Sequence, residues 1–303
     1  MFKFNNQFLN VCLLFILSSL WALHFSLVKL VDADQNPFSI LIPLLLILCI
    51  LFFCILKFFN KLFKFTYRKS FFFIVAGTFA YVVPLSVEFL VAPKIDAGIL
   101  TLIVSSVPVF TLLIVWQFRL LNVNLRLILG TLSGLIGISL IVLGNINNSL
   151  NLWLIVSIIV PLSYAFNAVF MEKYWPSNLN SLQMAFGECL TSFIFVLFLN
   201  FLIKGHLTNS IIEYAEWLFM PIFWILTFVT FLEVSLYFFL LNRIGAVFIN
   251  IGSYLVMPAG FLWGFVIFGE LFTLLKFICT LLIINAIFLI GSQKYKINNT
   301  PIE

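Results

Sequence analysis

Long apolar runs constrain this chain more than any other feature. Ten stretches of about 20 residues carry few charges and are separated by short breaks where charged residues, Asn, Gly or Pro cluster. Backbone N–H and C=O groups find no water inside a bilayer, so a run that crosses one must be a helix. We expect helices at 8–30, 38–58, 71–91, 97–118, 127–145, 152–172, 181–203, 217–240, 246–268 and 271–291.

The composition excludes a water-soluble fold. Hydrophobic residues make up 63 % of the 303 positions and charged residues only 9 %, whereas a soluble domain carries roughly 25 % charged residues. The loops leave no room for an appended soluble catalytic domain. The five Cys residues lie inside apolar runs without a C-x-x-C spacing, so we expect neither a disulfide frame nor a metal site. The first run is too long for a cleaved signal and is expected to stay as a helix.

The basic residues indicate an orientation. With a cytoplasmic N-terminus and ten spans, twelve of the sixteen Lys and Arg residues fall on the cytoplasmic side and four on the far side. This asymmetry follows the positive-inside rule and predicts that both termini are cytoplasmic. The net charge of +5 is spread in ones and twos along the loops, so it does not indicate a nucleic-acid partner.

The two halves of the chain resemble each other. Phe89 and Lys94 match Phe238 and Arg243 at an offset of 149 residues, and Ala97 matches the alanine at the same offset. Each half holds five expected helices, and because five is odd, the second half must enter the membrane from the opposite side. We therefore predict two inverted five-helix repeats, residues 1–147 and 148–303. This arrangement is typical of secondary transporters with a site at the membrane midplane.

Several short motifs occur in an order that is typical of one family. The first helix has a W-x3-F-x3-K pattern, and Pro37 opens the second. The fourth helix begins at Asp96-Ala97-Gly98 and contains Ser105-Ser106-Val107-Pro108. The turn between the ninth and tenth expected helices reads Phe268-Gly269-Glu270. In this the chain resembles the drug/metabolite transporter superfamily, specifically its ten-helix EamA-type exporters, over nearly its whole length.

The resemblance implies a fold and an activity. It implies a basket of ten helices around a cavity lined mainly by helices 1, 3, 4, 6, 8 and 9, with helices 5 and 10 as scaffold. It also implies alternating access and the export of amino acids or similar small amphipathic metabolites from a bacterial inner (plasma) membrane. The chain departs from the family pattern at Leu121, which stands where an acid is usual, and at Cys279 and Ala286, which stand where glycines are usual. These departures weaken the transfer of substrate and coupling residues.

Ionisable side chains within the apolar runs are candidates for a site, because a charge at bilayer depth costs about 2.5 to 3.5 kcal/mol. His24 lies three residues after Trp21 on the same helix face and can exchange a proton near neutral pH. Glu233 shares a face with Tyr237, and Glu88 follows Pro84 by one turn. We expect His24, Glu88 and Glu233 to couple to protons or charge. A hydrogen bond to a neighbouring helix for His24, and snorkelling to water for Glu88, remain alternatives. For Glu188 a structural pairing is favoured.

The remaining polar and aromatic side chains of these helices would shape a small-molecule pocket. The expected substrate-binding residues are Trp21, His24, Tyr81, Ser105, Ser106, Tyr164, Asn167, Tyr237, Asn250, Ser253 and Tyr254. Each could instead be a contact between helices. The small-x3-small pair of Gly130 and Gly134 is expected to let helices approach closely, as is the pair of Gly260 and Gly264.

Other functions fit the sequence less well. Two His residues cannot build the multi-histidine metal sites of membrane desaturases, and no H-E-x-x-H, G-x-S-x-G or Walker pattern occurs. We therefore expect no catalytic residue, metal or cofactor. The expected partners are a small-molecule solute, the lipid bilayer, protons and a second copy in a homodimer. A membrane-embedded assembly factor, or an intramembrane enzyme without a recognisable motif, is the alternative.

Overall fold

The fold is a bundle of helices, known here from a computed structural model that describes residues 2–31, 37–95, 97–118, 124–145, 152–204, 214–269 and 273–291. No strand occurs among these residues. Asp96, Leu121 and Glu270, which enter the family pattern, lie outside the described residues. The first half contains α1 (Phe2–Val31), α2 (Pro37–Phe58), α3 (Tyr67–Gly77), the π-helix η1 (Thr78–Val82), α4 (Val83–Val91), α5 (Ala97–Val104), α6 (Val107–Gln117) and α7 (Leu125–Asn145).

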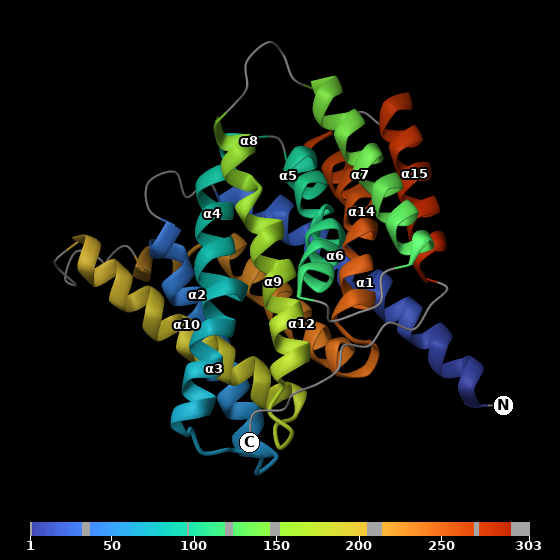
Figure 1. Cartoon of the computed structure of the whole chain (residues 1–303). Coiled ribbons are helices and arrows are strands. Elements are labelled where there is room, and N and C mark those ends of the chain that lie inside the picture. Colours follow the sequence, from blue (N-terminus) through green and yellow to red (C-terminus); the bar gives the residue numbers. More distant parts are fainter. Residues whose placement is uncertain are drawn as a thin grey trace.

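The second half also contains both long and broken helices (Figure 1). It contains α8 (Leu152–Ser157), α9 (Ile159–Tyr174), α10 (Ser181–Lys204), α12 (Pro221–Ile244), α13 (Ala246–Ile251), α14 (Ser253–Phe268) and α15 (Leu274–Gly291). Residues 214–218 form a further short helical turn before α12.

Within the described ranges, seven helical stretches are long and apolar enough to cross a membrane. They are Phe8–Val31, Pro37–Phe58, Tyr67–Val91, Leu152–Tyr174, Ser181–Ile203, Pro221–Ile244 and Phe248–Phe268. Val107–Gln117, Leu125–Gly137 and Phe277–Ala286 are shorter apolar helices. The chain is therefore an all-helical, multi-pass integral membrane protein.

The side chains of α12 show how the bundle meets lipid. Trp224 and Phe228 are exposed on its outer face, whereas Thr227, Thr230 and Glu233 are buried on its inner face. A helix of a soluble protein places its residues the other way round. An apolar exterior and a polar interior suit a protein whose solvent is hydrocarbon, because only the interior can satisfy polar groups.

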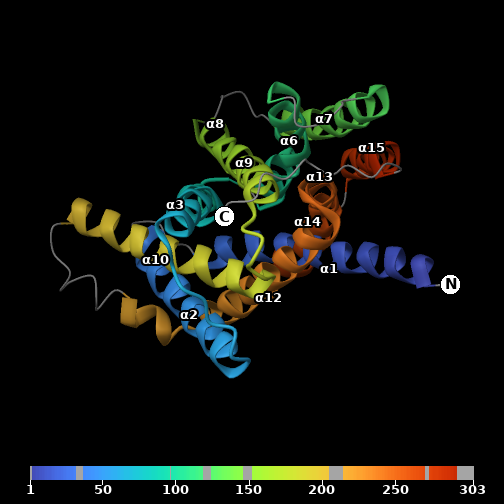
Figure 2. The same cartoon turned by 60° about the horizontal axis from the view of Figure 1, so that its bottom comes forward.

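The helices pair in a regular way. Helix α1 packs against α12 and α14, and α9 packs against α4 and α6. Helix α2 packs along α10, and α7 packs along α15. Figure 2 shows α7 and α15 side by side at one edge of the bundle, away from the helices around α1. The centre of the bundle is thus surrounded by α1, α4, α9 and α12, together with the helices η1, α5, α6, α13 and α14.

Local breaks occur in three of these helices, and two of the breaks lie directly before a proline. Pro84 has no N–H to donate, and the turn before it is the π-helix η1. The carbonyl of Phe79, five residues before Pro84, accepts a hydrogen bond from Ser163 Oγ of α9 at 2.9 Å instead. The break between α5 and α6 precedes Pro108, and the break between α13 and α14 lies ahead of Pro258.

One glycine of α7 makes room for a side chain of α14. A Cβ atom added to Gly134 would overlap the ring of Tyr254, which is fully buried. We expect Gly134→Ala to lower the free energy of unfolding in detergent by about 1–3 kcal/mol, because the ring has nowhere to move. Ile136→Ala is the control: Ile136 is exposed on the same helix, and its loss should change the free energy by about 0.5 kcal/mol or less. Equal losses of stability in Gly134→Ala and Ile136→Ala would show that the contact between Gly134 and Tyr254 tolerates a methyl group.

Candidate functional site

A cavity of about 100 Å³ lies at the centre of the bundle. It is enclosed by α1, η1, α4, α5, α6, α9, α10, α12, α13 and α14. The breaks beside η1, between α5 and α6, and between α13 and α14 all border it. The lining residues are Trp21, His24, Phe25, Ala80, Tyr81, Leu85, Val104, Val107, Tyr164, Asn167, Glu188, Thr230, Glu233, Val234, Tyr237, Asn250 and Ser253.

One end of the cavity holds a cluster of charged groups. His24 Nδ1 lies 3.0 Å from Glu233 Oε1, and His24 Nε2 lies 3.7 Å from Glu88 Oε2. The side chains are buried, with His24 3 %, Glu88 0 % and Glu233 7 % exposed. Thr230 Oγ1 lies 3.3 Å from His24 Nδ1, so α1 and α12 meet through this ring. A histidine between two carboxylates can hold a proton and pass it on.

Glu88 belongs to this cluster but does not line the cavity. Its Oε1 accepts a hydrogen bond of 2.7 Å from the hydroxyl of Tyr164, which does line it. Glu88 Oε2, Glu233 Oε2 and His24 Nε2 have no hydrogen-bond partner among the described residues. Buried polar atoms without partners are few in native proteins, and each calls for an explanation. Here they can be satisfied by a proton, a water molecule or a solute.

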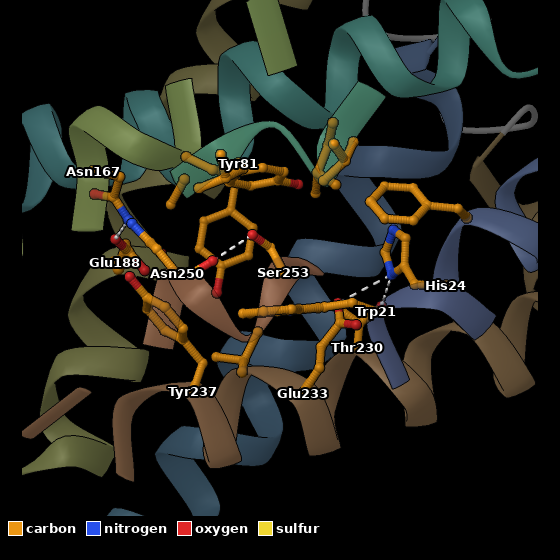
Figure 3. Close-up of a pocket in the computed structure, with 17 residues that line it drawn as sticks. Trp21, His24, Tyr81, Asn167, Glu188, Thr230, Glu233, Tyr237, Asn250 and Ser253 are labelled. Atoms are coloured by element: carbon orange, nitrogen blue, oxygen red, sulfur yellow. Dashed lines mark hydrogen bonds and ion pairs between the residues drawn. The ribbon is translucent and has the colours of Figure 1, made fainter. Parts of the chain in front are cut away.

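A second polar group lies at the opposite end. Asn167 Nδ2 donates a hydrogen bond of 3.3 Å to Glu188 Oε1, while Asn167 Oδ1 has no partner among the described residues. Figure 3 shows Asn167 and Glu188 at one end of the cavity and His24 with Glu233 at the other, with Trp21 and Tyr81 between them. The rings of Trp21 and Tyr237 lie 6.2 Å apart between centroids. The cavity thus has two polar ends joined by aromatic walls.

The structure brings together most of the residues that the sequence singled out. Trp21, His24, Tyr81, Tyr164, Asn167, Glu233, Tyr237, Asn250 and Ser253 all line this cavity. Asn250 Nδ2 also donates a hydrogen bond of 2.7 Å to Thr111 Oγ1. These residues therefore lie around one cavity, and the roles in binding that we expect for them stay predictions.

Three of the expected substrate-binding residues do not line the cavity. The hydroxyl of Ser105 donates to the carbonyl of Thr101 at 2.8 Å, and that of Ser106 donates to the carbonyl of Ile103 at 2.6 Å. Tyr254 lies against α7, with its hydroxyl 3.5 Å from the carbonyl of Thr131. Serine hydroxyls in helices commonly donate to a carbonyl of the preceding turn, so the hydrogen bonds of Ser105 and Ser106 are satisfied without a solute.

Several lining residues were not expected from the sequence. Glu188 lines the cavity as well as pairing with Asn167. Thr230 lies three residues before Glu233 and seven before Tyr237, so helical spacing could have placed it on the same face. The other unexpected lining residues are apolar, and nothing in the sequence distinguishes them from residues that face lipid. They are Phe25, Ala80, Leu85, Val104, Val107 and Val234.

Comparisons with known proteins agree with this architecture. The sequence model of the EamA-like transporter family matches residues 9–143 and again residues 151–292. A solved structure, described only as the crystal structure of a protein, shares the fold with a TM-score of 0.64 at 12 % sequence identity. The alignment covers 93 % of this chain and 98 % of the other. No curated protein matches the sequence significantly.

An all-helical membrane bundle around a cavity with polar groups at its two ends suits a membrane transporter. The double match to the family model covers most of the chain, once in each half. The chain belongs to the EamA-like transporter family, within the drug/metabolite transporter superfamily. Family membership implies a small-molecule solute and suggests that the protein is not an enzyme.

Proposed function

We propose that the chain is a secondary transporter that moves a small amphipathic metabolite through this cavity by alternating access. In this proposal ten spans, with both termini in the cytoplasm, form two inverted five-helix repeats of residues 1–147 and 148–303. The repeats rock against each other and expose the cavity to one side at a time. Export across a bacterial inner membrane is the proposed direction, and amino acids or related amines are solutes of suitable size.

Contacts across the bundle support the two-fold relation. Ser133 Oγ donates to the carbonyl of Leu282 at 3.1 Å, and these residues are 149 positions apart. The same offset relates Thr101 to Asn250 and Thr111 to Gly260. Asn250 bonds to Thr111, and the side chain of Thr101 lies where a Cβ atom of Gly260 would be, with Thr101 Oγ1 at 2.7 Å. Each contact is thus the counterpart of the other, as two repeats around one axis require.

The charged cluster carries the proposed coupling. His24, Glu88 and Glu233 come from α1, α4 and α12, which belong to different halves of the chain. Movement of one half against the other would change the distances within the cluster and therefore its affinity for a proton. Intramembrane acids and histidines commonly form proton relays in transporters. The single observation that carries the proposal is His24 between two buried carboxylates at the cavity wall.

Transport in proteoliposomes tests the coupling. Purified protein is reconstituted, loaded with pooled labelled metabolites, and given a pH gradient of either sign. We expect one or more solutes to move in response to the gradient, and Glu233→Gln to reduce that response by roughly tenfold or more, since the variant loses a charged partner of His24.

Glu216→Gln is the matched control. Glu216 is exposed in the short turn before α12 and does not line the cavity, so its loss should leave the response to the gradient unchanged. Normal coupling in Glu233→Gln would remove Glu233 from the mechanism. If no solute moved with the wild-type protein, the proposed function would fail as a whole.

A further inference from the structure

Glu188 is a buried acidic residue without a cationic partner among the residues that the structure describes. Its side chain is 1 % exposed and lines the cavity from α10. Among the described residues, no Lys, Arg or His lies within 4.0 Å of it, since the salt bridges there join His24 to Glu88 and Glu233. Asn167 supplies its one side-chain hydrogen bond, at 3.3 Å. Burying an ionised carboxylate costs free energy unless a cation or hydrogen-bond donors pair with it.

The hydrogen bonding of Asn167 indicates which chemical group could pair with Glu188. Its amide donates to Glu188, so its Oδ1 is left as a buried acceptor without a partner among the described residues, and the residue is 3 % exposed. This end of the cavity therefore presents an amide oxygen and a carboxylate, which are both acceptors. A group with several N–H donors and a positive charge satisfies both, and an ammonium group has three donors.

The walls beside these acceptors suit a cation with an apolar body. Tyr81 and Tyr237 line the cavity near Glu188, as Figure 3 shows. Aromatic faces attract cations and also cover the hydrocarbon part of an amine. Among the described residues, the lining holds no Lys or Arg, and His24 is already placed between two carboxylates. A carboxylate on the solute would therefore find no fixed cation of its own.

We propose that Glu188 and Asn167 bind the ammonium group of the transported solute, so that the solute is a small organic amine without a carboxylate. This inference rests on the proposed transport function and narrows its solute class. It separates the two ends of the cavity: α9 and α10 bind the solute's charge, while the cluster at His24 handles the proton. An amino acid would fit the ammonium end but would bring an uncompensated carboxylate among acidic groups.

Binding to the purified full chain in detergent tests the proposal by calorimetry. The probes are phenethylamine, its neutral counterpart phenethyl alcohol, the zwitterion phenylalanine and the anion phenylpropanoate, which share one aromatic body. We expect the amine to bind roughly tenfold or more tightly than the alcohol, since a charge-assisted hydrogen bond is worth that ratio. Phenylalanine and phenylpropanoate should bind more weakly than the amine.

Glu188→Gln should remove the preference for the amine and leave the affinity for phenethyl alcohol within about twofold, because only the charge is lost. Glu216→Gln, at an exposed position, should keep the preference. The wild-type comparison between amine and alcohol needs no variant, so it decides the question even if Glu188→Gln fails to fold. Equal binding of amine and alcohol, or tighter binding of phenylalanine than of the amine, would overturn the proposal.

Counterflow in proteoliposomes separates this inference from the transport function. Movement of phenylalanine by both wild type and Glu188→Gln would leave the transporter intact and contradict the amine site. Binding of the amine that depends on Glu188, without movement of any solute, would support the site and contradict the proposed transport.

Discussion

His24→Leu is expected to lower the free energy of unfolding by about 3–5 kcal/mol, the cost of removing one partner from a buried ionic group. In the folded protein His24 lies 3.0 Å from a Glu233 oxygen and 3.7 Å from a Glu88 oxygen. Leucine would leave two buried carboxylates close together with no positive group between them. Reversible unfolding in mixed detergent, followed by tryptophan fluorescence, measures the loss.

A combined variant separates stability from function. His24→Leu together with Glu88→Gln and Glu233→Gln removes the charges as a set, and replacing a whole buried ionic group is often neutral for stability. We expect this variant to unfold within about 1–2 kcal/mol of wild type and to show no response to a pH gradient. Its recovery of stability without coupling would show that the cluster is kept for transport.

Thr230→Val is the matched control for the single change. It keeps the shape of the side chain and removes only the hydroxyl that lies 3.3 Å from His24 Nδ1. Its expected cost is about 1 kcal/mol, that of one ordinary hydrogen bond. If His24→Leu cost no more than Thr230→Val, the two carboxylates would be uncharged in the folded protein, and the cluster could not act as proposed.

The positions of the helices could be predicted from the sequence because lipid leaves the backbone no alternative to a helix. The expected helix at 38–58 is observed as Pro37–Phe58, and that at 181–203 as Ser181–Lys204. The breaks inside the helices were less accessible. Pro84 marked a bend, but the π-helix at Thr78–Val82 also depends on Ser163 of another helix, which bonds to Phe79.

Helix faces were the harder part of the site. Polar residues such as Asn167 could be expected to face inward because lipid penalises them. That reasoning cannot separate a residue at the cavity from its neighbour. Val104 and Ser253, which correspond at an offset of 149, both line the cavity. Ser105 and Tyr254 correspond at the same offset, and neither lines it. Which of two adjacent residues lines the cavity depends on the helix breaks beside them. These breaks in turn depend on packing between helices, which the sequence does not reveal.

Two glycines with positive φ allow a comparison of backbone strain with packing. Gly245 joins α12 to α13 with φ 82° and ψ 165°, and Gly269 follows α14 with φ 67° and ψ 23°. The first conformation is open almost only to glycine, whereas the second is the left-handed helical region, which other residues enter at a cost of about 1–2 kcal/mol. A Cβ atom at Gly269 would meet nothing within 4 Å, but one at Gly245 would lie 2.8 Å from Glu172 Oε1.

The carboxylate at Gly245 has a structural role of its own. Glu172 is 6 % exposed, and its Oε2 accepts a hydrogen bond of 2.6 Å from the backbone N–H of Ala246, the first residue of α13. The end of α9 thereby satisfies one of the free N–H groups at the start of α13. A methyl group at Gly245 would push this carboxylate away, so the strain of the turn and the loss of the cap would occur together.

We therefore expect Gly245→Ala to lower the free energy of unfolding by about 3 kcal/mol or more, the sum of backbone strain and a displaced buried acceptor. Gly269→Ala should cost about 1–2 kcal/mol, since only the conformation is strained. Unfolding in mixed detergent compares the two. Glu172→Ala added to Gly245→Ala should cost less than the two single changes together, because the clash and the cap involve the same carboxylate. Equal costs for the two glycines would mean that the turn at Gly245 can move away from Glu172, and that α9 does not hold the start of α13.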